Sequence, residues 1–243
     1  LKQGFFPATG TPLFFVDLYQ TQGTDIHTSD ELADRVRNRL LTLDGVTEVS
    51  TWSGRGPIRF TMILLPERPD PAYAQLVVNV DDVEAVTGLM AEARDVIAAE
   101  FPEAHHMVRR LEFTSITASK IEARFYGSDR AELRGIAEQT MQHFIEHQLI
   151  DRKIDWREQR LSLAIIPDEA RARRAGVQLP DVSRAVESST VGTMVGVLRD
   201  GDKPVPIVAR ITPLAETAAE LIERDLWSES TQSFVSARQV VAG

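Results

Sequence analysis

Apolar and polar positions along the chain repeat one unit three times: a short apolar run, a helix start with an acid three residues on, and an amphipathic helix. The three apolar runs are LFFVDLY from Leu13, AYAQLVVNV from Ala72 and KIEARFYG from Lys120. In each copy an N-cap oxygen can accept from a backbone N–H of the first turn, while the following Glu reaches back to the cap. We expect these caps at Thr28, Asp81 and Asp129. Strand followed by helix, repeated, predicts small split βαβ sandwiches with helices on one face of a sheet.

The copies are not equally complete. Residues 13–115 read β-α-β-β-α-β, the ferredoxin-like plan, with strands expected at 13–19, 46–52, 57–65, 72–80 and 108–113. The third copy, with a helix ending near 148 and a short closing strand at 153–156, is half of a second such domain. From about residue 160 the pattern changes to short helices and hairpins, which predicts a separate small module. The fold class is therefore α+β: split βαβ sandwiches plus a small mixed α+β module.

Polar residues inside apolar strands are the first candidates for function. They are Asp17, Arg110, Glu112 and Arg124. Strand alternation makes each of them solvent-facing on an ordinary exposed sheet face. In the alternative interpretation two sheets face each other across a cleft, which these side chains line together with Phe15, Phe113 and Phe125.

A glycine-containing turn, Ser53-Gly54-Arg55-Gly56-Pro57, separates two expected strands. One interpretation is a plain hairpin turn. The other is a mobile glycine loop in which Gly54 and Gly56 allow movement and Arg55 lies beside the aromatic Trp52 and Phe60.

Charge and composition narrow the function classes. The net charge of −9 disfavours binding to nucleic-acid phosphate. The chain has no cysteine, which excludes disulfides, thiolate catalysis and Cys-ligated zinc. No stretch reaches the roughly 20 apolar residues of a membrane span, and no signal peptide is present. The chain opens on Leu1 and ends on Gly243 after apolar residues, which suggests a piece of a longer protein.

The histidines offer a weak metal hypothesis. His143 and His147 are four apart on an expected helix and could share a face, but a capping or surface role in the last turn is favoured. His105 and His106 are adjacent on a strand and point to opposite faces, so they cannot ligate one ion. We expect no metal and no cofactor.

A series of short motifs runs in collinear order along nearly the whole chain. They are FFP (5–7), PLFFV (12–16), GT (23–24) with Thr28, GVTEV (45–49), DW (155–156), IIPDEARARRAGVQLPDVSRAV (165–186), VG (195–196), RDGD (199–202), PIV (206–208) and Arg210. This series resembles the second large periplasmic loop of resistance-nodulation-division (RND) efflux transporters of the acriflavine-resistance type.

The resemblance implies three parts. Residues 1–117 would be a first porter-like subdomain, 118–158 the first half of a second, and 159–243 a docking-like module. In that family the second porter subdomain is built from segments before and after the docking module, and the later segment looks absent here. Family members are homotrimeric proton antiporters of the inner membrane that work with a periplasmic adaptor and an outer-membrane channel. This chain would reach the membrane only through segments it does not contain.

The resemblance also assigns roles. Amphiphilic small molecules would enter a cleft between porter subdomains, past a glycine switch loop at the position of Gly54 and Gly56, which is shorter here than in multidrug members. Phe15 and Asp17 match strand positions that line the entrance. A carboxylate at Asp17 would favour cationic or amphiphilic substrates by charge pairing. The chain's five methionines are scattered, so copper or silver export is not expected.

Three functions remain to be weighed. The first is the substrate-binding and docking portion of a multidrug-type transporter. The second is a free-standing ferredoxin-like sensor or regulatory module that binds a small molecule. The third, an acid–base enzyme using Asp17, Glu112 and Arg124, has no supporting motif.

Overall fold

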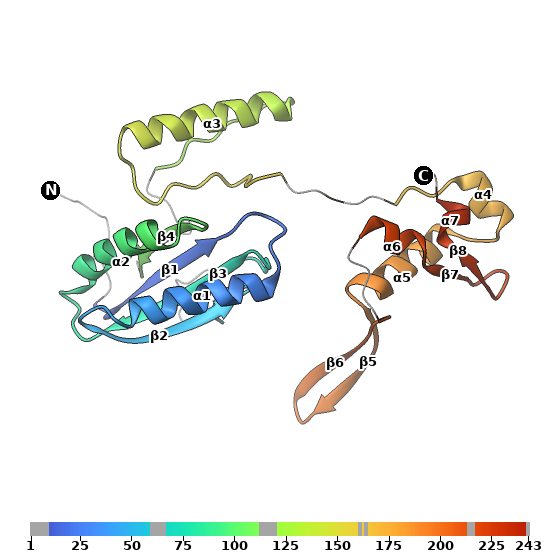
Figure 1. The fold of residues 1–243 in the computed structure, drawn as a ribbon, viewed down its shortest axis with the longest axis horizontal. Coiled ribbons are helices and arrows are strands. Elements are labelled where there is room, and N and C mark those ends of the chain that lie inside the picture. Colours follow the sequence, from blue (N-terminus) through green and yellow to red (C-terminus); the bar gives the residue numbers. More distant parts are fainter. Residues whose placement is uncertain are drawn as a thin grey trace. The chain divides into compact units, whose positions relative to one another are not determined.

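The chain forms two compact units in the computed structural model, Leu1–Leu161 and Ser162–Gly243 (Figure 1). The structure describes residues 10–58, 67–111, 121–159, 162, 165–212 and 217–241. Among the described residues, none of the helices combines the length and the apolar composition that crossing a bilayer requires.

The first unit contains a four-stranded antiparallel sheet with the strand order β2-β3-β1-β4. Its elements are β1 (Leu13–Tyr19), α1 (Ile26–Leu40), β2 (Val46–Ser53), β3 (Tyr73–Val80), α2 (Val86–Glu100) and β4 (His105–Arg110). This is the β-α-β-β-α-β plan predicted for the first two copies, and the α+β fold class is confirmed. The strand expected at 57–65 lies outside the described residues except for Pro57 and Ile58, which are irregular.

The main core lies between the sheet and its two helices. Phe14, Val16 and Leu18 alternate along β1 and are buried beneath α1 and α2. The helices contribute the stripe Leu32, Val36, Leu40, Leu89, Ala93 and Ile97. The opposite face of β1 is buried as well, because all seven residues of the strand are buried. The expectation of an exposed polar face on this strand is therefore wrong.

Two of the three predicted helix caps are wrong. Helix α1 begins earlier than expected, and its cap is Asp25, whose carboxylate accepts from the His27 N–H at 2.8 Å. Helix α2 begins after Ala85, which provides no side-chain cap, and Asp82 instead accepts from Glu84 in the preceding turn. Asp129 caps α3 (Arg130–Glu146) as predicted, accepting from two backbone N–H groups.

The third copy forms its helix but neither of its predicted strands. Residues 121–128 and 153–156 have no strand structure, and α3 buries none of its residues. A strand needs a hydrogen-bonding neighbour, and these two segments do not pair with each other. Residues 148–158, called the strap below, bond instead through their side chains to α2, to β4 and to the loop residues Glu67 and Asp70.

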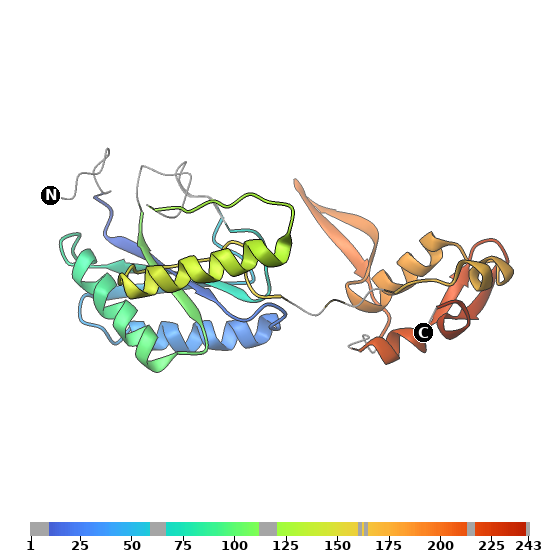
Figure 2. The same ribbon diagram turned by 90° about the horizontal axis from the view of Figure 1, so that it is seen from above.

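The second unit is a small mixed module. Its elements are α4 (Glu169–Arg174), α5 (Leu179–Thr190), β5 (Thr193–Asp200), β6 (Lys203–Ala209), α6 (Ala218–Ile222), β7 (Asp225–Ser228), β8 (Ser233–Ser236) and α7 (Ala237–Val240). Its core gathers Ala172, Val177, Val182, Leu226 and Val240. The β5–β6 hairpin projects away from this core within its unit (Figure 2).

Candidate functional site

The sheet face opposite the helices holds a buried polar cluster centred on Asp17. Asp17 lies mid-strand on β1 and is 2% exposed. Strand register places it opposite Gln75 on β3 and Met107 on β4. Tyr73 Oη and Gln75 Nε2 each donate to Asp17 Oδ1 at 2.6 Å, and Arg109 Nε donates to Oδ2 at 2.5 Å. A buried carboxylate is tolerated because a cation and two neutral donors satisfy it.

The environment of this cluster fixes the protonation of its phenols. Burial raises the pKa of Tyr73 well above its ordinary value, and the charge of Asp17 and the hydrogen bond to it add to the effect. Burial and the nearby charges of Asp17 and Glu67 raise the pKa of Tyr19 in the same way. Burial lowers the pKa of Arg109, but the adjacent Asp17 carboxylate outweighs it and leaves that pKa raised. Both phenols are therefore permanent donors at any physiological pH.

A second ion pair lies at the end of β1. Tyr19 Oη donates to Glu67 Oε1 at 2.8 Å, and Lys153 Nζ donates to the same oxygen at 3.0 Å. The ammonium of Lys153 also sits 4.6 Å from the centroid of the Tyr19 ring, a cation–π distance. Burial raises the pKa of Glu67, but the hydrogen bonds from Lys153 and Tyr19 outweigh it and hold that pKa below its usual value.

A third ion pair completes the site. Arg157 Nη1 donates to Asp70 Oδ2 at 2.6 Å, its Nη2 donates to the Gln20 carbonyl, and its guanidinium carbon lies 5.4 Å from the Tyr19 ring centroid. We call Asp17, Tyr19, Tyr73, Gln75 and Arg109 with Glu67 and Asp70 the sheet-face cluster. Its three carboxylates pair with Arg109, Lys153 and Arg157, and Arg157 Nε also lies 3.8 Å from Glu158 Oε2.

An apolar patch adjoins the cluster on the same face. Leu13, Phe15, Val77 and Leu111 are buried together, and Trp52 packs against them. The guanidinium of Arg109 lies 5.1 Å from the Phe15 ring centroid, which joins the patch to the polar cluster. The structure thus brings together three predicted residues, Phe15, Asp17 and Trp52.

The glycine loop is attached to the sheet at its first glycine. Gly54 N–H donates to the Tyr73 carbonyl at 2.7 Å, its own carbonyl accepts from Asp70 N–H at 2.9 Å, and its φ is +76°. A Cβ on Gly54 would lie 2.7 Å from Ile26, and one on Gly56 would lie 2.8 Å from Gln75 Oε1. The positive φ makes glycine the favoured residue at position 54, whereas at position 56 a Cβ would require the end of the Gln75 side chain to shift. Arg55 between them is exposed.

Two other predicted site residues, Arg110 and Arg124, are not brought to this face. Arg110 is opposite Phe14 in the register, so it lies on the helix side of β4. Arg124 is exposed on the irregular segment 121–128 and pairs with Glu122 at 2.6 Å. Phe60, Glu112 and Phe113 lie outside the described residues.

The histidines do not gather into a site. His143 Nδ1 is 3.3 Å from Glu146 on exposed α3, and His147 is the C-cap residue of that helix. Burial lowers the pKa values of His105 and His106. Within the described part of the chain, no three His, Cys, Asp or Glu residues are grouped so as to hold a metal ion.

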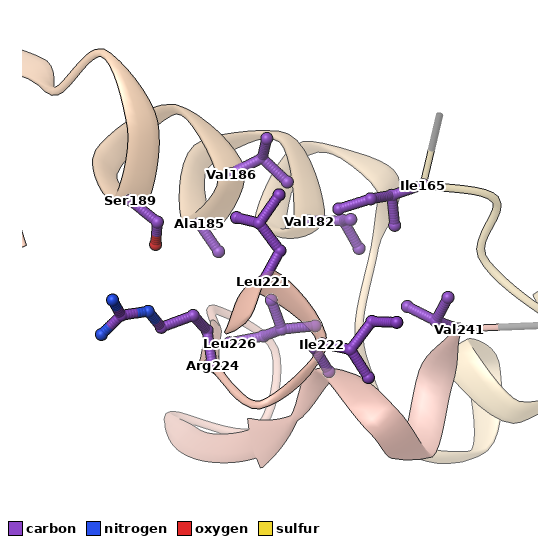
Figure 3. A pocket seen from close by; sticks show the side chains of 11 residues that line it. Ile165, Val182, Ala185, Val186, Ser189, Leu221, Ile222, Arg224, Leu226 and Val241 are labelled. Atoms are coloured by element: carbon purple, nitrogen blue, oxygen red, sulfur yellow. The ribbon is translucent and has the colours of Figure 1, made fainter. Parts of the chain in front are cut away.

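The second unit contains an apolar cavity and an adjoining groove. The cavity, about 10 Å³, lies between α5 and the chain around α6 and α7, as Figure 3 shows, and Ser189 lines it. The groove, about 470 Å³, runs along α5 and includes Leu179, Val186 and Leu221. The Ser189 hydroxyl is buried and has no hydrogen-bond partner among the described residues. The cavity has room for about one water molecule.

The fold and this site define a ferredoxin-like sheet unit with a cluster of ion pairs on one sheet face, followed in the chain by a second α+β unit. The profile of the AcrB/AcrD/AcrF family matches residues 1–237. The chain belongs to this family of RND efflux transporters.

Solved structures agree with the family assignment at the level of fold. Two crystal forms of a heavy metal efflux pump resemble the chain with TM-scores of 0.74 and 0.72, each at 17% sequence identity. The similarity covers 97% and 98% of this chain but 25% and 26% of those chains, so this chain spans about a quarter of their length. No curated protein is a significant match.

Proposed function

We propose that this chain is a periplasmic, substrate-contacting part of a proton-driven RND efflux transporter of the inner membrane. In this proposal residues 1–117 are a porter-like subdomain, 118–158 half of a second, and 159–243 a docking-like module. The transporter would be a homotrimer that works with a periplasmic adaptor and an outer-membrane channel. Family membership supports this assignment over a free-standing sensor module.

The single observation that carries the substrate-contacting role is the sheet-face cluster beside its apolar patch. Trp52 is partly exposed above the buried Phe15 and Val77. Tyr19 and Tyr73 lie beneath the adjoining acids, and their hydroxyls donate to Glu67 and Asp17. Apolar surface with a few placed polar groups is the usual chemistry of a small-molecule site. We therefore infer amphiphilic small molecules as the substrate class.

In this proposal the carboxylates of Glu67 and Asp70, and not that of Asp17, favour cationic ligands. The Asp17 side chain is 2% exposed and already bonded to Arg109, so a ligand does not reach it. The side chains of Glu67 and Asp70 are 35% and 33% exposed. A cationic headgroup could replace the ammonium of Lys153 at Glu67 and stack on Tyr19 as Lys153 does.

Organic cargo fits this lining better than soft metal ions. The resembling structures are described as heavy metal efflux pumps, but at 17% identity they inform on fold alone. The cluster offers phenol, amide and paired carboxylate groups, whereas soft metals prefer thiolate and thioether ligands.

The docking role is supported by exposed apolar surface in the second unit. Met194, Val197, Leu198 and Ile207 on the β5–β6 hairpin are each about half exposed or more. Apolar surface of this kind is typical of contacts between proteins. We infer that this hairpin contacts a neighbouring protomer.

Equilibrium dialysis of the purified chain against two matched ligands tests the substrate role. Tetraphenylphosphonium is an organic cation, and triphenylphosphine oxide is a neutral relative. Glu67→Gln should weaken binding of the cation by about fivefold, and Lys153→Ala should strengthen it by a similar factor, because an exposed charge pair contributes roughly 1 kcal/mol. The neutral ligand should respond to neither change. An equal response of both ligands, or no binding of the cation to any of the three proteins, would contradict the proposal.

A further inference from the structure

The strap is held in an unusual way. Residues 148–158 form neither helix nor strand, and two of them that are not glycine, Gln148 and Asp151, have positive φ values of 55° and 54°. For Gln148 this is the ordinary left-handed residue after a helix C-cap. Asp151 has no such helix end, and a left-handed residue there persists when its surroundings enforce it. The contacts of the Asp151 side chain with β4 and α2 supply that enforcement.

Asp151 clasps the edge of the sheet. Its Oδ1 accepts from the Val108 N–H at 3.0 Å, and its Oδ2 accepts from Arg94 Nη2 at 2.8 Å. Arg94 Nη2 also donates to the Val108 carbonyl at 3.0 Å. Since β4 is at one edge of the sheet, Asp151 and Arg94 together fill the N–H and C=O positions that a further strand would occupy. Both side chains are about one-fifth exposed, so this clasp is partly shielded from water.

The two strap cations follow the clasp in the chain. Lys153 is two residues beyond Asp151 and reaches Glu67 and the Tyr19 ring, and Arg157 reaches Asp70 and the same ring. The strap therefore places its own ammonium and guanidinium where a cationic ligand would pair. An internal cation at these acids competes with any external one.

We propose that Asp151 is a positioning residue: by clasping the edge of β4 it holds Lys153 and Arg157 against Glu67, Tyr19 and Asp70, and its release opens these acids to an organic cation. This inference rests on the proposed function for the identity of the ligand. The holding of Lys153 by Asp151 can be measured without any ligand.

Lysine acetylation read by mass spectrometry measures the strap directly. The lysines of the chain are Lys2, Lys120, Lys153 and Lys203. Lys153 is 22% exposed and paired, whereas Lys203 is exposed on β6 and serves as the internal reference. In Asp151→Ala, acetylation of Lys153 relative to Lys203 should rise about tenfold, because charge-assisted hydrogen bonds contribute roughly 1.5 kcal/mol or more.

Matched variants separate the clasp from general destabilisation. Asp151→Asn keeps an acceptor for the Val108 N–H but loses the charge facing Arg94, and should give an intermediate ratio. Glu100→Gln breaks an exposed pair with Arg39, also between α2 and a neighbouring element, and should leave the ratio unchanged. If Asp151→Ala does not fold, Arg94→Met provides the same readout from the other side of the pair. An unchanged Lys153 ratio in the folded clasp variants overturns the inference.

Tetraphenylphosphonium binding distinguishes the two proposals. Asp151→Ala should strengthen binding of the cation, as Lys153→Ala does, and leave triphenylphosphine oxide unaffected. If Lys153→Ala strengthens cation binding but Asp151→Ala does not, the clasp inference fails while the proposed function stands. If Asp151→Ala exposes Lys153 yet no variant binds the cation, the proposed function fails and the ligand half of this inference fails with it, whereas the clasp stands.

Discussion

Arg109 Nε on β4 donates to Asp17 Oδ2 on β1 across 2.5 Å, at the centre of a buried sheet face. The pair links the edge strand β4 to its neighbour β1, and the guanidinium of Arg109 neutralises the Asp17 carboxylate, which is 2% exposed. Removing one partner of a buried pair leaves an uncompensated charge, which costs more than the pair contributes as a whole.

Arg109→Ala should therefore lower the free energy of unfolding by roughly 3–5 kcal/mol. Asp34→Asn, which removes an exposed pair with Arg37, should change it by less than about 1 kcal/mol and is the control. Urea denaturation followed by circular dichroism measures both. Equal effects of the two substitutions would show that the Asp17–Arg109 pair is not buried as described.

Alkaline stability should depend on two phenols. The pKa values of Tyr19 and Tyr73 are raised in the folded chain, so the unfolded chain loses these protons first as the pH rises. Their stabilising effect is complete below the unfolded pKa of about 10 and is lost as the pH climbs from there toward the folded values.

The free energy of unfolding of the wild-type chain should therefore decline from about pH 10 upward, and less steeply in the double variant Tyr19→Phe/Tyr73→Phe. Denaturation series from pH 8 to pH 11 provide the measurement. Parallel curves for the two proteins would count against buried phenols.

Gly54 should resist substitution for reasons of structure. A Cβ there meets Ile26 at 2.7 Å on a backbone with φ +76°, and the residue bonds to both Tyr73 and Asp70. Gly54→Ala should destabilise the chain by about 1–2 kcal/mol.

Gly88→Ala is the matched control, since Gly88 is inside α2 with open space around its Cβ position and should gain about 1 kcal/mol in a helix. Thermal unfolding compares the two variants. If Gly54→Ala left the stability of the chain unchanged, the mobile switch interpretation of the loop would be favoured instead. In that interpretation the substitution slows efflux without loss of folded protein.

The pattern of apolar residues predicted the ferredoxin-like plan because the buried side chains of its strands and helices recur with the periods of those elements. The faces of the strands could not be assigned in the same way. Phe14 and Phe15 are both apolar, so β1 gives no indication of which side meets the helices, and Arg109 and Arg110 are chemically identical. Strand register alone places Arg109 in the cluster and Arg110 opposite Phe14.

Long-range contacts account for the other differences. Lys153 and Arg157 lie more than 80 residues from the acids that they pair with, which no local pattern reveals. Helix α1 is capped by Asp25 and not by the expected Thr28, and Ser29, inside the helix, has its hydroxyl 2.8 Å from Gln20 Oε1 and 2.6 Å from the Pro71 carbonyl oxygen. Asp129 was predictable because its capping is entirely local.

The claim that the sheet face is a substrate-contacting site is tested most directly by NMR of the tryptophan indoles during tetraphenylphosphonium titration. Trp52 packs on the patch beside the cluster, whereas Trp227 contacts Phe234 in the second unit, with ring centroids 5.0 Å apart. We predict a saturable shift of the Trp52 indole signal, larger in Lys153→Ala, with the Trp227 signal unmoved. A shift of Trp227 alone, or equal shifts of both, would contradict the account.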